Sequence, residues 1–252
     1  MDNALALSMP DYRFKIPWQL RTALWGGAVF AALCVIFLRE HRLLVGYALL
    51  VPALLLAGAG MMLFLISDPK RRTAACIRMV ASVAWSGAEQ VLDVGCGNGL
   101  VLLTAAKHLH AHKGKATGID IWHAIAGRQS LEKLRRNAEI ENVVDRIESR
   151  EADARQMPFD NGAFDVVCAS LSLHHAGNRA DRTRVLAEME RVLKPGGVIL
   201  AYDMFPVTNE AAGTLRHLGV TEIEYLSGLL LRVLRARTSQ ETKCAGDLPA
   251  QA

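Results

Sequence analysis

The sequence predicts an α/β protein in which a doubly wound, largely parallel sheet follows a pair of apolar helices. Three observations lead to this prediction. Two long runs near the start of the chain hold no charged residue, strand-like and helix-like segments alternate from residue 69 onward, and three glycines in five residues follow the first of the strand-like segments. Such alternation is typical of a parallel sheet covered by helices.

The two uncharged runs are Thr22–Leu38, with 17 residues, and Leu43–Ser67, with 25. As helices they would be about 25 and 37 Å long, one slightly shorter and one longer than the roughly 30 Å thickness of the bilayer hydrocarbon. A core helix normally keeps one polar face, and a secretory signal peptide has a shorter apolar core followed by a cleavage site. We therefore expect a membrane hairpin over residues 1–68, with helices at about 20–38 and 43–67, through which the chain can also form oligomers.

Charge is distributed unevenly along the chain. Residues 1–90 hold nine Lys/Arg and five Asp/Glu, a net of +4, whereas residues 91–252 hold twenty of each. The expected hairpin loop carries only Arg39 and Arg42, while four basic residues follow the second helix within residues 70–78. Because basic flanks remain on the cytoplasmic side, we expect a two-pass membrane protein with both termini and the following domain in the cytoplasm. Without a basic domain surface, no nucleic-acid partner is expected.

Cysteine usage argues against two kinds of site. The five cysteines are scattered and form no CxxC pair, so the sequence predicts neither a metal site nor a disulfide framework.

The strands of the domain, expected over residues 69–238, are short apolar segments bounded by turn residues. They are expected at Gln90–Val94, Lys115–Ile121, Arg146–Arg150, Phe164–Ser170, Val198–Asp203, Glu222–Leu226 and Leu229–Arg235. The fifth begins directly after a Pro-Gly-Gly turn at residues 195–197.

The helices of the domain fill the intervals between these strands. They are expected at Arg71–Trp85, Leu100–His112, Ser130–Glu141, Ala180–Val192 and Asn209–Leu218. In the third, Leu131, Leu134 and Ala138 share one face, as an amphipathic helix requires. The polar tail at 239–252 is expected to be flexible.

The glycine-rich stretch reads VLDVGCGNG over Val91–Gly99. In a doubly wound sheet, the loop after the first strand passes beneath a ligand, and glycines there allow positive φ and close approach of the backbone. The dinucleotide fingerprint would put its third glycine at Leu100, whereas it stands here at Gly99. The acidic Asp93 before the loop disfavours phosphate and tolerates a cationic ligand.

The segment LDVGCGNG resembles motif I of the class I S-adenosylmethionine (SAM) methyltransferases. GIDIW, EADARQMPF, NGAFDVVCASLSLHH and EMERVLKPGGVIL continue the resemblance in register, and it extends over roughly Thr73–Arg237. It is similar to the branch that contains quinone-biosynthesis and small-molecule enzymes. The resemblance implies a seven-stranded sheet in the order 3-2-1-4-5-7-6, with strand seven antiparallel. The hairpin lies outside the core pattern of the family, although membrane-anchored members exist.

The resemblance also implies a set of SAM-binding residues. The glycine loop would admit the methionine and ribose parts, Asp120 would accept the ribose hydroxyls, Asp153 would accept from the adenine amino group, and Ser170 would lie near the sulfonium. The full set is Asp93, Gly95, Cys96, Gly97, Gly99, Asp120, Ile121, Asp153, Ala154 and Ser170. Other readings stay open: Asp120 as a helix N-cap, and Asp153 as a solvated loop acid.

Two histidines follow the fourth expected strand, where the family binds the methyl acceptor. His174, and with less support His175, are candidate catalytic bases, because an imidazole accepts a proton near neutral pH. A structural histidine or a helix cap is the alternative for each. The sequence thus predicts a membrane-anchored SAM-dependent methyltransferase acting on a small-molecule or lipid acceptor, at O, S, N or C. The rivals are a non-catalytic SAM-binding membrane protein and a nicotinamide-dependent oxidoreductase.

Overall fold

The computed structural model describes residues 10–12, 18–39, 43–122, 125–228 and 230–239. Most of the expected hairpin loop and most of the expected tail fall outside the described residues. The chain divides into two units, one of residues 13–72 and one that holds the described residues on either side of that range.

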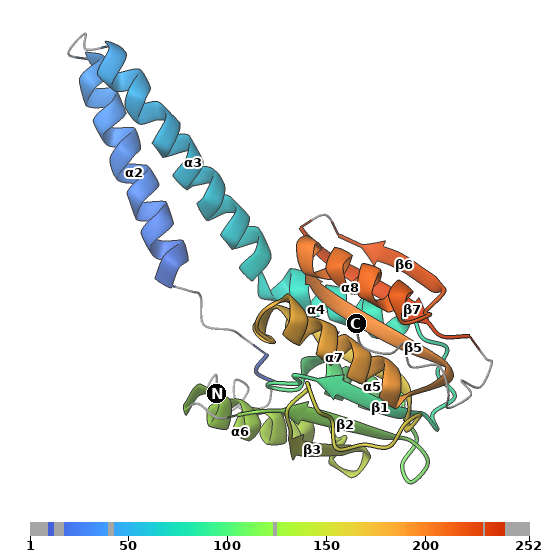
Figure 1. The fold of residues 1–252 in the computed structure, drawn as a ribbon. Helices are drawn as coiled ribbons and strands as arrows, with labels where there is room; N and C mark the ends of the chain where they lie inside the picture. Colours follow the sequence, from blue (N-terminus) through green and yellow to red (C-terminus); the bar gives the residue numbers. More distant parts are fainter. Residues whose placement is uncertain (1–9, 13–17, 40–42, 123–124, 229, 240–252) are drawn as a thin grey trace, which may run out of the picture. The chain divides into compact units, whose positions relative to one another are not determined.

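The first of these units is a pair of helices, α2 (Trp18–Arg39) and α3 (Leu43–Ser67), which lie side by side (Figure 1). The expected helices at about 20–38 and 43–67 are therefore present. They approach closely at Gly27, where a Cβ atom would lie 3.5 Å from the backbone nitrogen of Ala57. Many of their large apolar side chains are exposed: Trp25, Val29, Leu33, Val35, Ile36, Val45, Tyr47, Leu50, Val51, Leu54 and Leu55.

The membrane-spanning part of the expectation is not supported. Across the described residues, no helix is both long and apolar enough to cross a bilayer.

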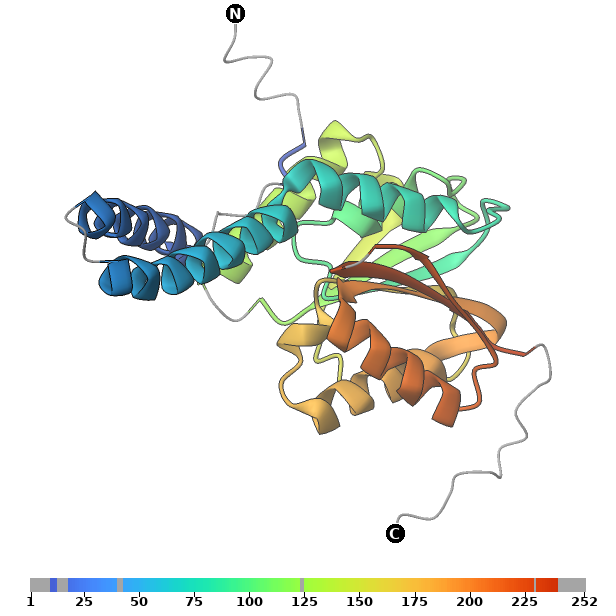
Figure 2. The same ribbon diagram turned by 90° about the horizontal axis from the view of Figure 1, so that it is seen from above.

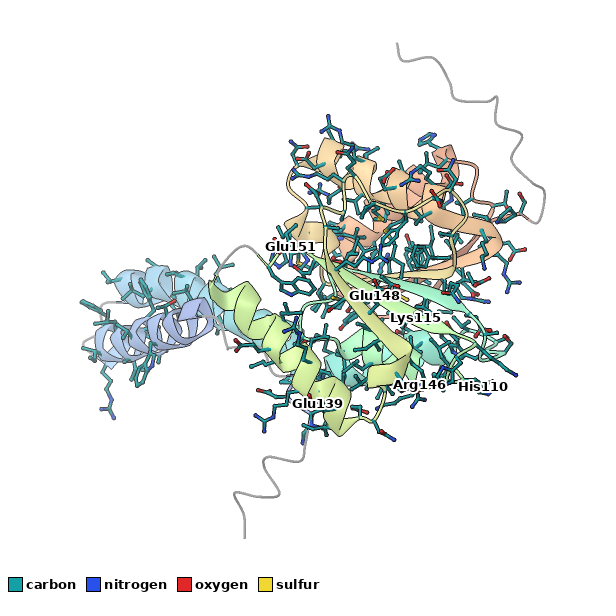
Figure 3. All side chains as sticks on the ribbon, turned by 90° about the horizontal axis from the view of Figure 1, so that it is seen from below. His110, Lys115, Glu139, Arg146, Glu148 and Glu151 are labelled. Atoms are coloured by element: carbon teal, nitrogen blue, oxygen red, sulfur yellow. The ribbon has the colours of Figure 1, made fainter. Side chains whose placement is uncertain are left out.

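The second unit contains a seven-stranded sheet in the order β3-β2-β1-β4-β5-β7-β6, as the sequence predicts. Strand β7 runs antiparallel to both β5 and β6, and the other pairings are parallel. The strands are β1 (Gln90–Val94), β2 (Lys115–Asp120), β3 (Ile147–Glu151), β4 (Phe164–Ser170), β5 (Leu193–Met204), β6 (Glu222–Ser227) and β7 (Leu231–Arg237). In Figure 3, Glu151 is the last residue of β3, and Arg146 immediately precedes the first residue of that strand.

Helices cover both faces of this sheet (Figure 2). One face packs on α4 (Pro69–Ala81), α5 (Leu100–Ala106) and α6 (Ile125–Ile140). The other packs on α7 (Arg179–Val192) and α8 (Phe205–His217). Side chains of β1 point alternately to the two faces of the sheet: Val91 packs with α4, α5 and α6, whereas Leu92 and Val94 pack on the face covered by α7 and α8.

Several element boundaries differ from the sequence expectation by one to six residues, and two of these differences have identifiable reasons. Helix α5 ends at Ala106 rather than His112, because the chain turns so that the backbone N–H of His110 can donate to the carbonyl of Gly87, at 2.8 Å. Strand β5 begins at Leu193, before the expected turn. Pairing jumps from Phe164↔Leu193 to Val166↔Val198, so the Pro-Gly-Gly segment forms a bulge within the strand.

A short N-terminal segment also packs on the sheet-containing unit, although the sequence assigned it to the hairpin. Asn137 is buried, and its side chain accepts from the backbone N–H of Asp11 at 2.8 Å and donates to the carbonyl of Asp11 at 3.2 Å. The same amide donates to the carbonyl of Asn98, at 3.1 Å. Residues 10–12 are thereby fixed beside the glycine loop.

Candidate active site

The carboxyl ends of β1, β2, β4 and β5 meet at one edge of the sheet, and β1 lies between β2 and β4. Ligands of open α/β sheets bind at such a point, where consecutive crossovers leave in opposite directions. The glycine loop leaves β1 there, and its backbone is tied to β2, because the N–H groups of Gly95 and Cys96 both donate to the carbonyl of Ile119, at 2.8 and 3.1 Å.

The three glycines all have positive φ, but they serve different purposes. The φ values are 72° at Gly95, 52° at Gly97 and 88° at Gly99. A Cβ at Gly95 would lie 2.4 Å from the Cβ of Ser172, and one at Gly99 would lie 3.2 Å from the side chain of Leu103. A Cβ at Gly97 would meet no atom within 4 Å. Of the three, Gly97 therefore leaves its backbone open to a ligand, while Gly95 makes room for Ser172 and Gly99 packs closely against Leu103.

Cys96 lies between the first two of these glycines, but its side chain faces the core. Its sulfur would be 2.7 Å from a Cβ on Gly118, and the residue is 6% exposed. Any contribution of Cys96 to ligand binding is therefore limited to its backbone.

Asp93 is a buried carboxyl beneath the loop, with only 2% of its surface exposed. Its Oδ2 accepts the backbone N–H of Leu102 at 3.0 Å, whereas Oδ1 has no hydrogen-bond partner among the described residues. Burial raises the pKa of Asp93 to about 7, and the charge of Asp120 adds to the increase. A cation near this carboxyl would favour its ionised form.

Asp120 stands at the end of β2 and reaches across to the loop. Its Oδ2 accepts the backbone N–H of Gly97 at 2.9 Å, and its Oδ1 accepts that of Ile121 at 2.7 Å. The same Oδ1 also accepts the backbone N–H of Trp122, at 3.4 Å, so the described contacts of Asp120 lie at the loop and just after the strand end. Ile121 is 49% exposed and is available to a ligand on that side.

Asp153 and Ala154 lie in the loop after β3, which is anchored to β2 by a 3.1 Å hydrogen bond from the N–H of Ala152 to the carbonyl of Asp120. The carboxylate of Asp153 forms an ion pair with Arg155, at 2.7 Å. A role of Asp153 toward adenine remains a prediction.

The turn after β4 is held by contacts to both neighbouring strands. The backbone N–H of Leu171, at a φ of 52° that is unusual for this residue type, donates to the carbonyl of Tyr202 at 2.7 Å. The hydroxyl of Ser172 donates to the carbonyl of Val94, also at 2.7 Å. Ser170 lies at the end of β4 with its hydroxyl 3.5 Å from the sulfur of Cys76. Sequence reasoning missed Ser172, although its contact with Gly95 explains that glycine.

His174 and His175 follow in a short 3-10 turn (Leu173–His175). Nδ1 of His174 lies 2.9 Å from Oδ1 of Asp203, a carboxyl that is fully buried at the end of β5. The two histidine rings lie 3.9 Å apart, centroid to centroid. Burial lowers the pKa of His175, and the nearby charge of His174 adds to this, while Asp203 and Asp120 oppose it. Asp203 did not emerge from the sequence, where it reads as one acid after an apolar strand.

Comparison with known proteins is consistent with this geometry. A family model described as a methyltransferase domain matches residues 92–201, which run from β1 into β5. The segment of the chain that contains this match is called the methyltransferase domain below, after the family model that it resembles. A solved SAM-dependent methyltransferase from Aquifex aeolicus shares the fold of the methyltransferase domain, with a TM-score of 0.53 and 18% identity over 68% of this chain and 94% of that one.

Two curated relatives match the methyltransferase domain in sequence. The 27-O-demethylrifamycin SV methyltransferase of Amycolatopsis mediterranei is 33% identical over 134 residues, 53% of this chain and 45% of that protein. The phosphatidylethanolamine N-methyltransferase of Cereibacter sphaeroides is 33% identical over 138 residues, 55% of this chain and 58% of that protein. The chain spans about half the length of these relatives.

SAM is the cofactor of the methyltransferase domain, and the residues present fit it. The open side of Gly97 admits a ligand against the backbone, and the unpartnered oxygen of Asp93 provides negative charge for a cation. None of the three proteins named here is a nicotinamide-dependent enzyme.

Proposed function

We propose that this chain is a methyltransferase that moves the methyl group of SAM to a small or lipophilic acceptor. The observation that carries the proposal is the glycine loop, whose backbone is open at Gly97 and whose neighbours include two carboxyl groups, that of Asp93 in β1 and that of Asp120 at the end of β2. A sulfonium cation with a ribose needs both features, namely close backbone approach and acidic groups.

In this proposal the chain's own residues bind and orient the cofactor, which supplies an activated methyl group. Asp120 accepts the ribose hydroxyls, Asp153 and Ala154 border the adenine, and Ser170 lies toward the sulfonium. Because the methyl group is already activated, much of the rate enhancement comes from holding the acceptor in line and excluding water.

We propose that most of the surface of the acceptor is apolar. Two observations favour this. The exposed apolar side chains of α2 and α3 suit a lipid environment, and the names of the two curated relatives specify a rifamycin and a phospholipid. The relatives differ in the atom methylated, O in one and N in the other, so they do not indicate the nucleophile.

We also propose that the apolar hairpin holds the enzyme at a membrane, with both termini and the methyltransferase domain on the cytoplasmic side. Support comes from the uncharged lengths of the two runs and from the basic residues that follow the second. The same apolar surface would alternatively join copies of the chain.

The function is tested by supplying labelled SAM to the full chain in vesicles together with a total lipid and small-molecule extract. A labelled product that requires the intact protein is expected. Binding of SAM, but not of NAD, in calorimetry without any labelled product would instead identify a non-catalytic SAM-binding protein. Absence of SAM binding would overturn the proposal.

A further inference from the structure

Asp203 is a fully buried carboxyl whose contacts serve one histidine. Oδ1 lies 2.9 Å from Nδ1 of His174 and also accepts the backbone N–H of Met204, at 2.8 Å. Oδ2 lies 3.3 Å from the backbone nitrogen of His174. Both the ring and the main chain of His174 are thus tied to the same carboxylate, which has 0% of its surface exposed.

This arrangement decides which ring nitrogen carries the proton. A buried carboxylate accepts hydrogen bonds and donates none, so Nδ1 of the neutral imidazole must be the protonated nitrogen. Nε2 is then left with its lone pair. The side chain of His174 is 23% exposed, and among the described residues the hydrogen bonds of its ring are confined to Nδ1. The lone pair of Nε2 is therefore available to solvent or to a bound acceptor.

The turn that carries His174 is attached to the cofactor loop. Ser172, two residues before it, bonds to the carbonyl of Val94 and packs against Gly95. On the other side of the turn, His175 senses the negative charges of Asp120 and Asp203. The ring of His174 therefore belongs to the same group of strand ends as the proposed SAM site.

We propose that Asp203 is a positioning residue that holds His174 as a general base with Nε2 directed to the acceptor, and that the acceptor nucleophile is a hydroxyl. This inference rests on the proposed function and identifies the substrate class for the same site. An aspartate–histidine pair has this role in serine proteases, where the aspartate fixes the tautomer and stabilises the imidazolium.

The proton inventory favours a hydroxyl over the other nucleophiles. A neutral amine attacks with its own lone pair, an alkene has no proton to lose before attack, and a thiol with a pKa of about 8.5 ionises appreciably near neutral pH. An alcohol or phenol keeps its proton until a base takes it. As the oxygen–carbon bond forms, the hydroxyl proton moves to Nε2 of His174. The carbon–sulfur bond breaks with its electron pair remaining on sulfur, and the imidazolium later releases the proton to water.

The first test reads the tautomer directly and needs no acceptor. The full chain, labelled with nitrogen-15 at histidine and held in detergent micelles, is compared with the Asp203→Ala and Asp203→Asn variants by two-bond nitrogen–proton correlation NMR. The His174→Gln variant assigns the signals. We expect Nδ1 to be the protonated nitrogen in the parent and in Asp203→Asn, whose amide oxygen still accepts, and a mixture of tautomers in Asp203→Ala.

Asp165→Asn is the matched control, because this aspartate lies at the opposite end of β4 and pairs with Lys194 at 2.8 Å. It should leave the tautomer of His174 unchanged. A parent protein in which Nε2 carries the proton would overturn the inference, and so would a tautomer that is the same in Asp203→Ala as in the parent. If the Ala variant does not fold, the tautomer of the parent and the turnover of Asp203→Asn in the second test decide the inference.

The second test uses carbon-13 methyl-labelled SAM with the total extract, because the chemical shift of the transferred methyl group identifies the atom that received it. We expect an O-methyl product, and an apparent kcat at least about 100-fold lower in Asp203→Asn, with SAM affinity within twofold of the parent. A product methylated only on N, S or C would overturn the substrate class. If no product forms at all, the proposed function fails, while the tautomer measurement still decides whether Asp203 positions His174.

Discussion

Substitution of Gly97 by valine provides a sharp test of the cofactor loop, because a second glycine with a positive φ and open surroundings lies outside the proposed site. Gly97 has a φ of 52°, Gly219 has a φ of 88° in the turn after α8, and a Cβ at either position would meet no atom within 4 Å. Placing a residue other than glycine in the left-handed, positive-φ conformation destabilises the folded protein by roughly 1–2 kcal/mol. Gly97→Val and Gly219→Val should therefore lower the melting temperature by similar amounts, a few degrees for a domain of this size.

The two variants should differ in SAM binding. Forcing extra carbons into a filled space costs roughly 1–3 kcal/mol, which corresponds to an affinity loss of about 5- to 150-fold. Isothermal titration calorimetry should show that loss for Gly97→Val and parental affinity for Gly219→Val. Unchanged SAM affinity in a folded Gly97→Val protein, or equal losses in both variants, would refute the assignment of this loop.

Three further predictions follow from the same structure. Burial holds the pKa of Asp93 near 7, and a bound cation would lower that pKa. SAM binding at pH 6 should therefore release a proton, and SAM affinity should increase as the pH rises to 7 and stay constant above pH 7. Calorimetry in buffers of different ionisation heat should detect the released proton, and Asp93→Asn should abolish the release. Asp120→Ala removes a charged acceptor worth roughly 1.5–3 kcal/mol per hydrogen bond, so SAM affinity should fall at least tenfold, and a change of less than twofold would contradict ribose binding. Leu54 and Leu55 are 63% and 69% exposed on α3, and changing both to glutamate should abolish flotation of the full chain with phospholipid vesicles. The control variant Val144→Glu, at a 56% exposed position of the methyltransferase domain, should still float. Continued flotation of the double variant would count against the membrane proposal.

Much of the fold follows from the sequence because each strand carries its own signal. The bounds of β1 and β4 match the expectation residue for residue, since both are apolar runs closed by glycine-rich or polar turns. The order of the strands came from the resemblance to a known family, not from the runs themselves. Helix ends were less predictable, because α5 ends where the backbone of His110 finds the carbonyl of Gly87, a partner distant in sequence.

The glycine loop shows where pattern reasoning stops. Three glycines in one motif suggested one shared purpose, namely close approach of a ligand. The structure separates them, because Gly95 makes room for Ser172 and Gly99 for Leu103, while Gly97 faces open space. The sequence does not distinguish these roles, since Ser172 and Leu103 are identified as the neighbours of Gly95 and Gly99 only by packing.

The pairing of His174 with Asp203 depends on one residue whose conformation runs against its type. Adjacent pairing of β4 with β5 brings Ser170 opposite Tyr202, so Asp203 lies just beyond the last paired residue. An extended chain after Ser170 would carry His174 away from that point. Leu171 instead adopts a left-handed φ of 52°, which turns the chain back toward β5. Leucine seldom adopts this conformation, and no sequence pattern predicts it here. Its cost is offset by the hydrogen bonds from Leu171 to Tyr202 and from Ser172 to Val94, which close only when both neighbouring strands are in place. The candidate base is therefore positioned by the assembled sheet, and this explains why the histidine, but not its aspartate, could be selected from the sequence.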